Sequence, residues 1–116
     1  MATRIYKVLT ATELNEARAT GRFEGSADDR RDGFIHLSAA DQLEDTLAKH
    51  FASRPDLMLL TVDAEMLGAA LRWEPSRGGA LFPHLYGPLP LAAVLSTATL
   101  PLDVDGRHMV PLGAPA

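Results

Sequence analysis

Two histidines stand out because each lies within an apolar stretch that alternates like a β-strand. In residues 33–38, alternation places Phe34, His36 and Ser38 on one face, and Ile35 and Leu37 on the other. We expect the apolar pair to face the core, so that the imidazole of His36 points to the opposite side. A histidine at a strand end beside a helix start suits an anion or a polar ligand. The alternative is a ring that only hydrogen-bonds a neighbouring carbonyl.

The second histidine belongs to a row of rings in residues 81–86. Phe82, His84 and Tyr86 share one predicted face of this strand, and the residues between them share the other. Aromatic faces stack planar ligands, and the histidine can hydrogen-bond such a ligand. The alternative is an exposed edge strand with amphipathic side chains. We predict that His36 and His84 lie on neighbouring strands, open onto one cleft and are the catalytic residues.

A third group surrounds the turn at residues 75–79. Trp73, the only tryptophan, is either a core side chain or a platform for a ligand ring. Arg77 carries a planar guanidinium that matches carboxylate or phosphate geometry. The glycines that follow Arg77 would let this loop close over a bound molecule. The predicted ligand-binding residues are Ser38, Trp73, Arg77 and Tyr86.

Composition and motif content exclude several kinds of site. The chain has no cysteine, which excludes disulfides, thiolate metal sites and a cysteine nucleophile. It has four histidines, but no H-x-H or H-E-x-x-H spacing, and we predict no metal site. The G-x-G-x-x-G and Walker A motifs are missing, as is the G-x-S-x-G elbow of many hydrolases.

Charge argues against a nucleic-acid partner. The formal net charge is −4, and Asp28, Asp29 and Asp32 flank the cationic cluster Arg30–Arg31. A nucleic-acid-binding domain normally carries a basic patch or stripe. We interpret residues 22–32 as a solvated loop. The expected partner is a small polar or nucleotide-like ligand, and the oligomeric state is left open.

Length and hydropathy indicate one domain over residues 1–116. This length is near the commonest domain size, and 47% hydrophobic content supports one core at about residues 4–105, followed by a loose tail. No apolar run approaches the roughly 18 residues that span a bilayer. The first residues lack the apolar segment of a signal peptide. We expect no membrane association and a cytoplasmic location.

Two helices are expected early in the chain. The first covers residues 13–19 after a cap at Thr12 and ends at Gly21. The second is capped by Ser38 and stopped by Arg54–Pro55. Its predicted core-facing stripe consists of Ala40, Leu43, Leu47 and Phe51.

Most strands are expected after these helices. Because Pro83 lacks a backbone donor, it predicts that its strand is either at a sheet edge or irregular. This order favours an α+β fold, with two early helices packed on a mostly antiparallel sheet. The predicted strands are residues 5–9, 33–37, 57–62, 71–74, 81–86 and 91–100.

Three segments resemble the domain-of-unknown-function 952 family. They are residues 32–38 (DGFIHLS), 71–74 (LRWE) and 81–89 (LFPHLYGPL), and the resemblance extends over about residues 4–105. It implies a small bacterial protein with an ADP-ribosyltransferase-like fold and no established activity.

A more distant likeness connects the chain with RNA 2′-phosphotransferases, which use NAD on that fold. Residues 34–38 (FIHLS) are similar to their His-Val-His-Leu-Ser motif, and residues 62–64 (VDA) to their Ile-Asp-Ala. The likeness implies NAD as a cofactor. Residues 6–9 (YKVL) stand where those enzymes carry Tyr-His-Gly-Thr, and Phe34 replaces the first histidine of the second motif.

These departures leave three hypotheses open. The first is an ADP-ribosyltransferase-like enzyme that uses NAD or a related nucleotide, with His36 and His84 orienting the substrate. The second is a non-catalytic binding module that kept the cleft of the fold. The third is an interaction partner of another protein. Lys7 and Val8, in place of histidine and glycine, favour the second hypothesis over the first.

Overall fold

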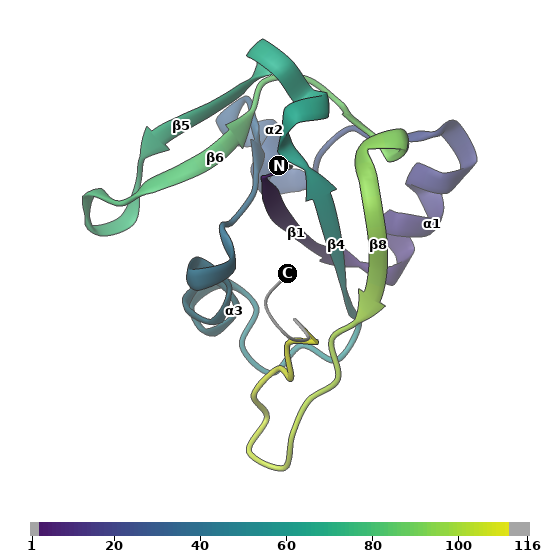
Figure 1. Cartoon of the computed structure of the whole chain (residues 1–116). Helices are drawn as coiled ribbons and strands as arrows, with labels where there is room; N and C mark the ends of the chain where they lie inside the picture. The colour runs from purple at the N-terminus through teal and green to yellow at the C-terminus, as the bar shows by residue number, and fades with distance from the viewer. Residues whose placement is uncertain (1–2, 112–116) are drawn as a thin grey trace.

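A computed structural model describes residues 3–111 and shows an α+β architecture built on antiparallel strand pairs. The longest strands form one three-stranded sheet in the order β1-β4-β8 (Figure 1). They are β1 (Arg4–Thr10), β4 (Leu57–Asp63) and β8 (Val94–Thr99). These segments are rich in β-branched and large apolar residues, which favour strands. The predicted strand 91–100 starts late, because Leu91–Ala93 form a 3₁₀ turn (η4).

The strands that carry His36 and His84 belong to a second sheet, which has the order β3-β6-β5. Its strands are β3 (Ile35–His36), β6 (Leu81–Leu85) and β5 (Leu71–Pro75). Of the two predicted settings for residues 81–86, the sheet edge was wrong, since β6 is central. The nitrogen and the carbonyl of Pro83 face the side of β3, where the carbonyl accepts the Leu37 N–H at 3.1 Å. Pro83 is tolerated because β3 ends at His36, so its nitrogen lies beyond the paired residues and needs no hydrogen.

The expected single sheet is therefore divided, although the two parts touch at one point. Tyr6 in β1 and Ser38 after β3 form an antiparallel bridge, with N–H···O distances of 2.8 and 2.9 Å. A separate two-stranded ribbon pairs β2 (Arg22–Phe23) with β7 (Leu89–Pro90). Its first strand lies in residues 22–32, which the sequence suggested were a loop.

The first helix, α1 (Ala11–Thr20), is close to its predicted position, but its cap is Thr10 rather than Thr12. The Thr10 hydroxyl accepts the Glu13 N–H, and the Glu13 carboxylate accepts the Thr10 N–H, which is a capping box. The chain then turns at Gly21, where a φ of 85° is readily available to glycine.

The predicted loop at residues 22–32 contains a short helix, α2 (Ala27–Asp32), so that prediction was wrong. Ser26 and Asp29 form a capping box, with the Ser26 N–H donating to Asp29 Oδ2 at 2.9 Å. Gly33 closes the helix with a φ of 84°. Because this helix is charged along its length and has no apolar stripe, its position depends on the capping box and on the ion pair between Asp29 and Lys7.

The third helix begins as a 3₁₀ turn, η1 (Ala40–Gln42), and continues as α3 (Leu43–His50). Ala39, not Ser38, is its N-cap residue, and the Gln42 side chain accepts the Ala39 N–H. Leu43 and Leu47 are buried as predicted, whereas Ala40 is exposed, because the tighter 3₁₀ turn displaces it from the stripe.

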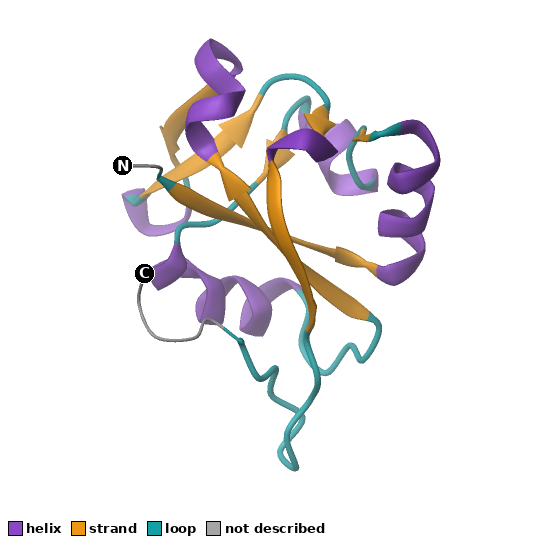
Figure 2. Cartoon of the chain, turned by 45° about the vertical axis from the view of Figure 1, so that its right-hand side comes forward, coloured by secondary structure: helices purple, strands orange, loops and turns teal. Residues whose placement is uncertain are grey.

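Two apolar clusters cover the two faces of the β1-β4-β8 sheet. Ile5 and Leu9 face α1 on one side, while Tyr6 and Val8 face α3 on the other, as strand alternation requires. The view in Figure 2 shows the crossed strands between these helices.

Further 3₁₀ segments are η2 (Ala64–Ala70), capped by Asp63, and η3 (Arg77–Gly79).

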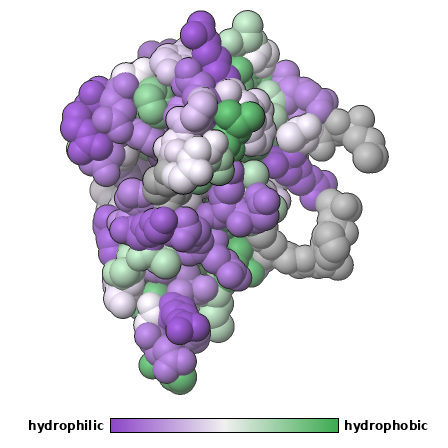
Figure 3. Space-filling view, turned by 90° about the vertical axis from the view of Figure 1, so that its left-hand side faces the viewer, coloured by the Kyte–Doolittle hydropathy of each residue, from purple (hydrophilic) through white to green (hydrophobic). Residues whose placement is uncertain are grey.

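The side that carries α3 and the β5–β6 hairpin has a mostly hydrophilic surface (Figure 3). Within residues 3–111, none of the helices combines the length and apolar character needed to cross a membrane. The tail that we expected to be loose, residues 113–116, lies outside the described residues.

Candidate functional site

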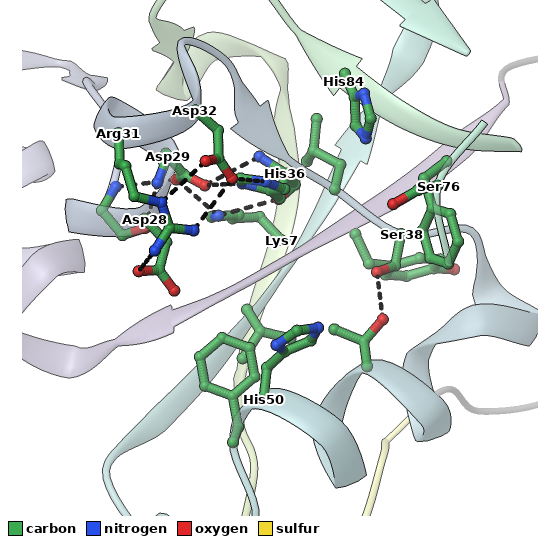
Figure 4. Close-up of a pocket in the computed structure, with 17 residues that line it drawn as sticks. Lys7, Asp28, Asp29, Arg31, Asp32, His36, Ser38, His50, Ser76 and His84 are labelled. Atoms are coloured by element: carbon green, nitrogen blue, oxygen red, sulfur yellow. Dashed lines mark hydrogen bonds and ion pairs between the residues drawn. The ribbon is translucent and has the colours of Figure 1, made fainter. Parts of the chain in front are cut away.

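A cleft of about 450 Å³ lies where the two sheets diverge. Residues from β1, α2, β3, α3 and β6 line it, together with the turn at Ser76 (Figure 4). His36 and His84 are paired across β3 and β6, and their ring centroids are 5.9 Å apart. Both histidines line the cleft, so the prediction that they share one cleft on neighbouring strands is confirmed.

A buried ion pair between Lys7 and Asp29 supports one wall of the cleft. Lys7 Nζ lies 2.9 Å from Asp29 Oδ2, and the two side chains are only 5% and 2% exposed. The same ammonium donates to the carbonyl of His36 at 3.0 Å. Burial alone would raise the pKa of Asp29, but the His36 hydrogen bond and the Lys7 charge outweigh it and hold this pKa well below its usual range.

His36 contacts a carboxylate with each ring nitrogen. Its Nδ1 lies 2.6 Å from Asp29 Oδ1, and its Nε2 lies 2.9 Å from Asp32 Oδ2. Its backbone N–H also donates to Asp29 Oδ1, at 3.1 Å. Both ring contacts are hydrogen bonds only in the protonated form, since a carboxylate can only accept.

A charged rim continues outward from His36. Arg31 Nε lies 3.0 Å from Asp32 Oδ1, and its Nη1 lies 3.3 Å from Asp28 Oδ1. The hydrogen bond from Arg31 lowers the pKa of Asp32, and the charge of Arg31 acts in the same direction. These groups are largely exposed, so they contribute to the charge pattern of the rim more than to stability.

His84 has a different environment. Its Nδ1 lies 2.8 Å from Glu74 Oε1, and the Tyr86 hydroxyl donates to the same oxygen at 2.7 Å. The hydrogen bonds from Tyr86 and then His84 lower the pKa of Glu74, and the same carboxylate raises the pKa of Tyr86. Phe34 stacks on the His84 ring at 4.0 Å with an interplanar angle of 25°.

The other predicted site residues are only partly assembled here. Ser38 lines the cleft, is buried, and lies 3.1 Å from the hydroxyl of Thr46. Tyr86 packs beside Phe34, with ring centroids 5.4 Å apart, and supports His84 through Glu74 rather than lining the cleft.

Trp73 does not line the cleft, and its ligand-binding role stays a prediction. Trp73 pairs with Pro83, whereas Arg72 pairs with His84. Directly paired residues share a face and neighbours alternate, so Trp73 lies on the opposite face of this sheet. The backbone of Arg77 begins η3, but its side chain lies outside the described part of the structure.

Four charged residues that the sequence reasoning did not select contact the two histidines or their supports. Lys7 stood alone among apolar residues in a strand, which was a usable signal of a buried partner. Asp29 was identifiable as the N3 residue of a Ser-x-x-Asp cap. The four residues are Lys7, Asp29, Asp32 and Glu74.

In the part of the chain that the structure describes, no group of three or more histidine or acidic side chains is arranged to hold a metal ion.

Comparison with known proteins identifies the family. The model of the family described as "Protein of unknown function (DUF952)" matches residues 8–97. The chain belongs to this family. A search of curated proteins gave no match.

Solved structures of Caulobacter crescentus protein CC0527 are similar to this family member. The crystal structure is 55% identical with a TM-score of 0.89, and the match covers 92% of this chain and 94% of that one. The solution NMR structure of CC0527 is 56% identical with a TM-score of 0.81, and the match covers 90% of each chain.

Proposed function

We propose that the cleft binds a small, hydroxyl-rich, nucleotide-like ligand and that the protein is an ADP-ribosyltransferase-like transferase with NAD as the first candidate cofactor. The observation that carries this proposal is the pairing of His36 and His84 on one wall of the cleft, each fixed by carboxylates. Histidines fixed by carboxylates recur at sites that orient a ligand or move protons.

The size and chemistry of the cleft fit this class of ligand. Its volume of about 450 Å³ lies within the range of roughly 300–1,000 Å³ typical of small-molecule sites. Its lining combines the Ser38 and Ser76 hydroxyls and the Asp28 carboxylate with the aromatic ring of Phe82. Hydroxyls and carboxylates hydrogen-bond sugar hydroxyls, and an aromatic ring packs against a base or a pyridine.

The family resemblance supports the choice of NAD. In the motif FIHLS, which is similar to that of RNA 2′-phosphotransferases, His36 and Ser38 both line the cleft. In that comparison the motif belongs to enzymes that use NAD, and here both positions form part of the cleft lining.

The second candidate function is a binding module without catalysis, and Lys7 favours it. Lys7 stands where the related motif has a histidine, and its ammonium is already engaged by Asp29 and the His36 carbonyl. It therefore stabilises the wall of the cleft rather than contacting a ligand.

A thermal-shift screen with NAD, ADP-ribose, AMP and nicotinamide tests ligand binding. A ligand at 100 times its dissociation constant should stabilise the protein by about 2.7 kcal/mol. His84→Ala should abolish the shift. Trp73→Ala, on the opposite face, should preserve it and serves as the matched control. A screen in which none of the four compounds shifts the wild type would contradict the proposal.

Release of nicotinamide from NAD then separates the two candidate functions. Turnover that is lost in His84→Ala supports the transferase. Binding of NAD or ADP-ribose without turnover supports the binding module.

A further inference from the structure

The ring of His84 is held in one tautomer by its surroundings. A carboxylate oxygen only accepts hydrogen bonds, so the 2.8 Å contact with Glu74 Oε1 requires hydrogen on Nδ1 of His84. In the neutral ring the lone pair is then on Nε2. Glu74 is itself fixed by the Tyr86 hydroxyl at 2.7 Å, and these hydrogen bonds lower its pKa, which keeps it ionised.

The Nε2 edge of His84 is the part of the ring that remains for a ligand. The residue is only 6% exposed, and Phe34 covers one ring face at 4.0 Å. Among the residues that the structure describes, none hydrogen-bonds Nε2. Figure 4 shows the ring extending toward the cleft, which His36 and Ser76 also line. Approach is therefore from the cleft and in the plane of the ring.

His36 cannot take the same role. Both of its ring nitrogens already contact carboxylates, Asp29 at 2.6 Å and Asp32 at 2.9 Å. A ring engaged at both nitrogens has no lone pair to offer to a ligand. The two histidines were predicted as an equivalent pair, but their contacts assign them different chemistry.

We propose that His84 is a general base, with Glu74 as the residue that positions it, and that its substrate is a hydroxyl-bearing molecule held in the cleft. The hydroxyl O–H bond breaks and a bond forms between that proton and Nε2. The electron pair of the substrate oxygen forms the new bond to the ribose carbon of NAD, the co-substrate of the proposed function, while the bond from that carbon to nicotinamide breaks and nicotinamide leaves. Glu74 stabilises the resulting imidazolium through its contact with Nδ1. The inference rests on the proposed function for its ligand only, because the state of the ring is defined without one.

Nitrogen-15 NMR of the histidine rings tests the proposal in the ligand-free protein at pH 8, above the ordinary histidine pKa of about 6.5. The expected result is a neutral His84 with hydrogen on Nδ1. Glu74→Ala should lose this preference. Tyr86→Phe, which keeps the carboxylate beside His84, should retain it and is the matched control. A wild-type ring with hydrogen on Nε2 would overturn the proposal.

Modification by diethyl pyrocarbonate tests whether the lone pair can be reached. The reagent acylates unprotonated imidazole nitrogens, so mass spectrometry should locate the adduct on His84, and AMP at saturation should reduce it. An unmodified His84 in protein whose exposed histidines react would overturn the proposal. The NMR measurement and the modification without AMP do not depend on ligand binding. A failed thermal-shift screen would therefore contradict the proposed function without deciding the state of His84.

Discussion

The two three-stranded sheets of this protein are stabilised in different ways. The β1-β4-β8 sheet has strands of seven, seven and six residues, and apolar clusters cover both of its faces. The β3-β6-β5 sheet has strands of two, five and five residues, and on its cleft face His36 and His84 contact carboxylates. Apolar burial therefore stabilises the β1-β4-β8 sheet, which we call the framework, whereas ion pairs and hydrogen bonds position the candidate site.

Lys7 connects the two regions. It belongs to β1 of the framework, yet its ammonium contacts Asp29 of α2 and the carbonyl of His36 in β3. A change at this ion pair should therefore affect both the framework and the site, whereas a change in an apolar cluster should affect mainly the framework.

The largest effect is expected from breaking the Lys7–Asp29 pair. Asp29→Ala leaves a buried ammonium without its carboxylate and should lower the free energy of unfolding by about 3–5 kcal/mol. Urea denaturation measures this change. Lys7→Met should cost less, because Asp29 keeps its contacts with His36 and Ser26.

The double variant Lys7→Met/Asp29→Ala sharpens this prediction. It should cost less than the sum of the two single changes, because no unpaired charge remains. Additive costs would show that the two regions are not coupled through this pair.

The next effect concerns the framework alone. Leu47→Ala removes a side chain that is 3% exposed and should lower the free energy of unfolding by about 2–5 kcal/mol. Phe51→Ala should cost less than a buried aromatic normally does, because Phe51 is only half-buried at the end of α3. A loss near zero for Leu47→Ala in chemical denaturation would contradict this assignment of the core face. Neither change should alter the ring NMR of His84.

The smallest expected effect is the decrease of the free energy of unfolding as the pH falls. The pKa of Asp29 is lower in the folded protein than its ordinary value of 3.8, so its contribution is complete above that pH and is lost as the pH falls below it. Urea midpoints measured from pH 5 down to pH 2 should fall more steeply in the wild type than in Asp29→Asn. Asp105→Asn, at an exposed position, should match the wild-type slope. Parallel slopes for wild type and Asp29→Asn would contradict the depressed pKa.

The contrast between the regions also explains which predictions from the sequence were correct. Residues 5–9 and 57–62 were correctly predicted as strands, and Leu43 and Leu47 as core, because apolar periodicity reports burial directly. Alternation likewise placed His36 and His84 toward one cleft. The catalytic and ligand-binding roles of these residues stay predictions.

Errors were concentrated where contacts distant in sequence decide the structure. Residues 22–32 were assigned to a loop because they are charged and show no apolar helical periodicity. The helix within them depends on the capping box of Ser26 and Asp29. The position of Trp73 relative to the cleft likewise depends on a contact distant in sequence, because its pairing with Pro83 places it on the face of the sheet opposite His84.

Local sequence patterns were therefore sufficient to predict the α+β class, the long strands, the buried face of α3 and the two histidines of the cleft. These features follow from local periodicity and residue type, which act over a few neighbouring positions. The tertiary structure alone decided that the sheet divides, that Lys7 pairs with Asp29 and that Glu74 fixes His84. Such contacts join residues 10 to 22 positions apart, and their free energy depends on burial and geometry that no local pattern encodes.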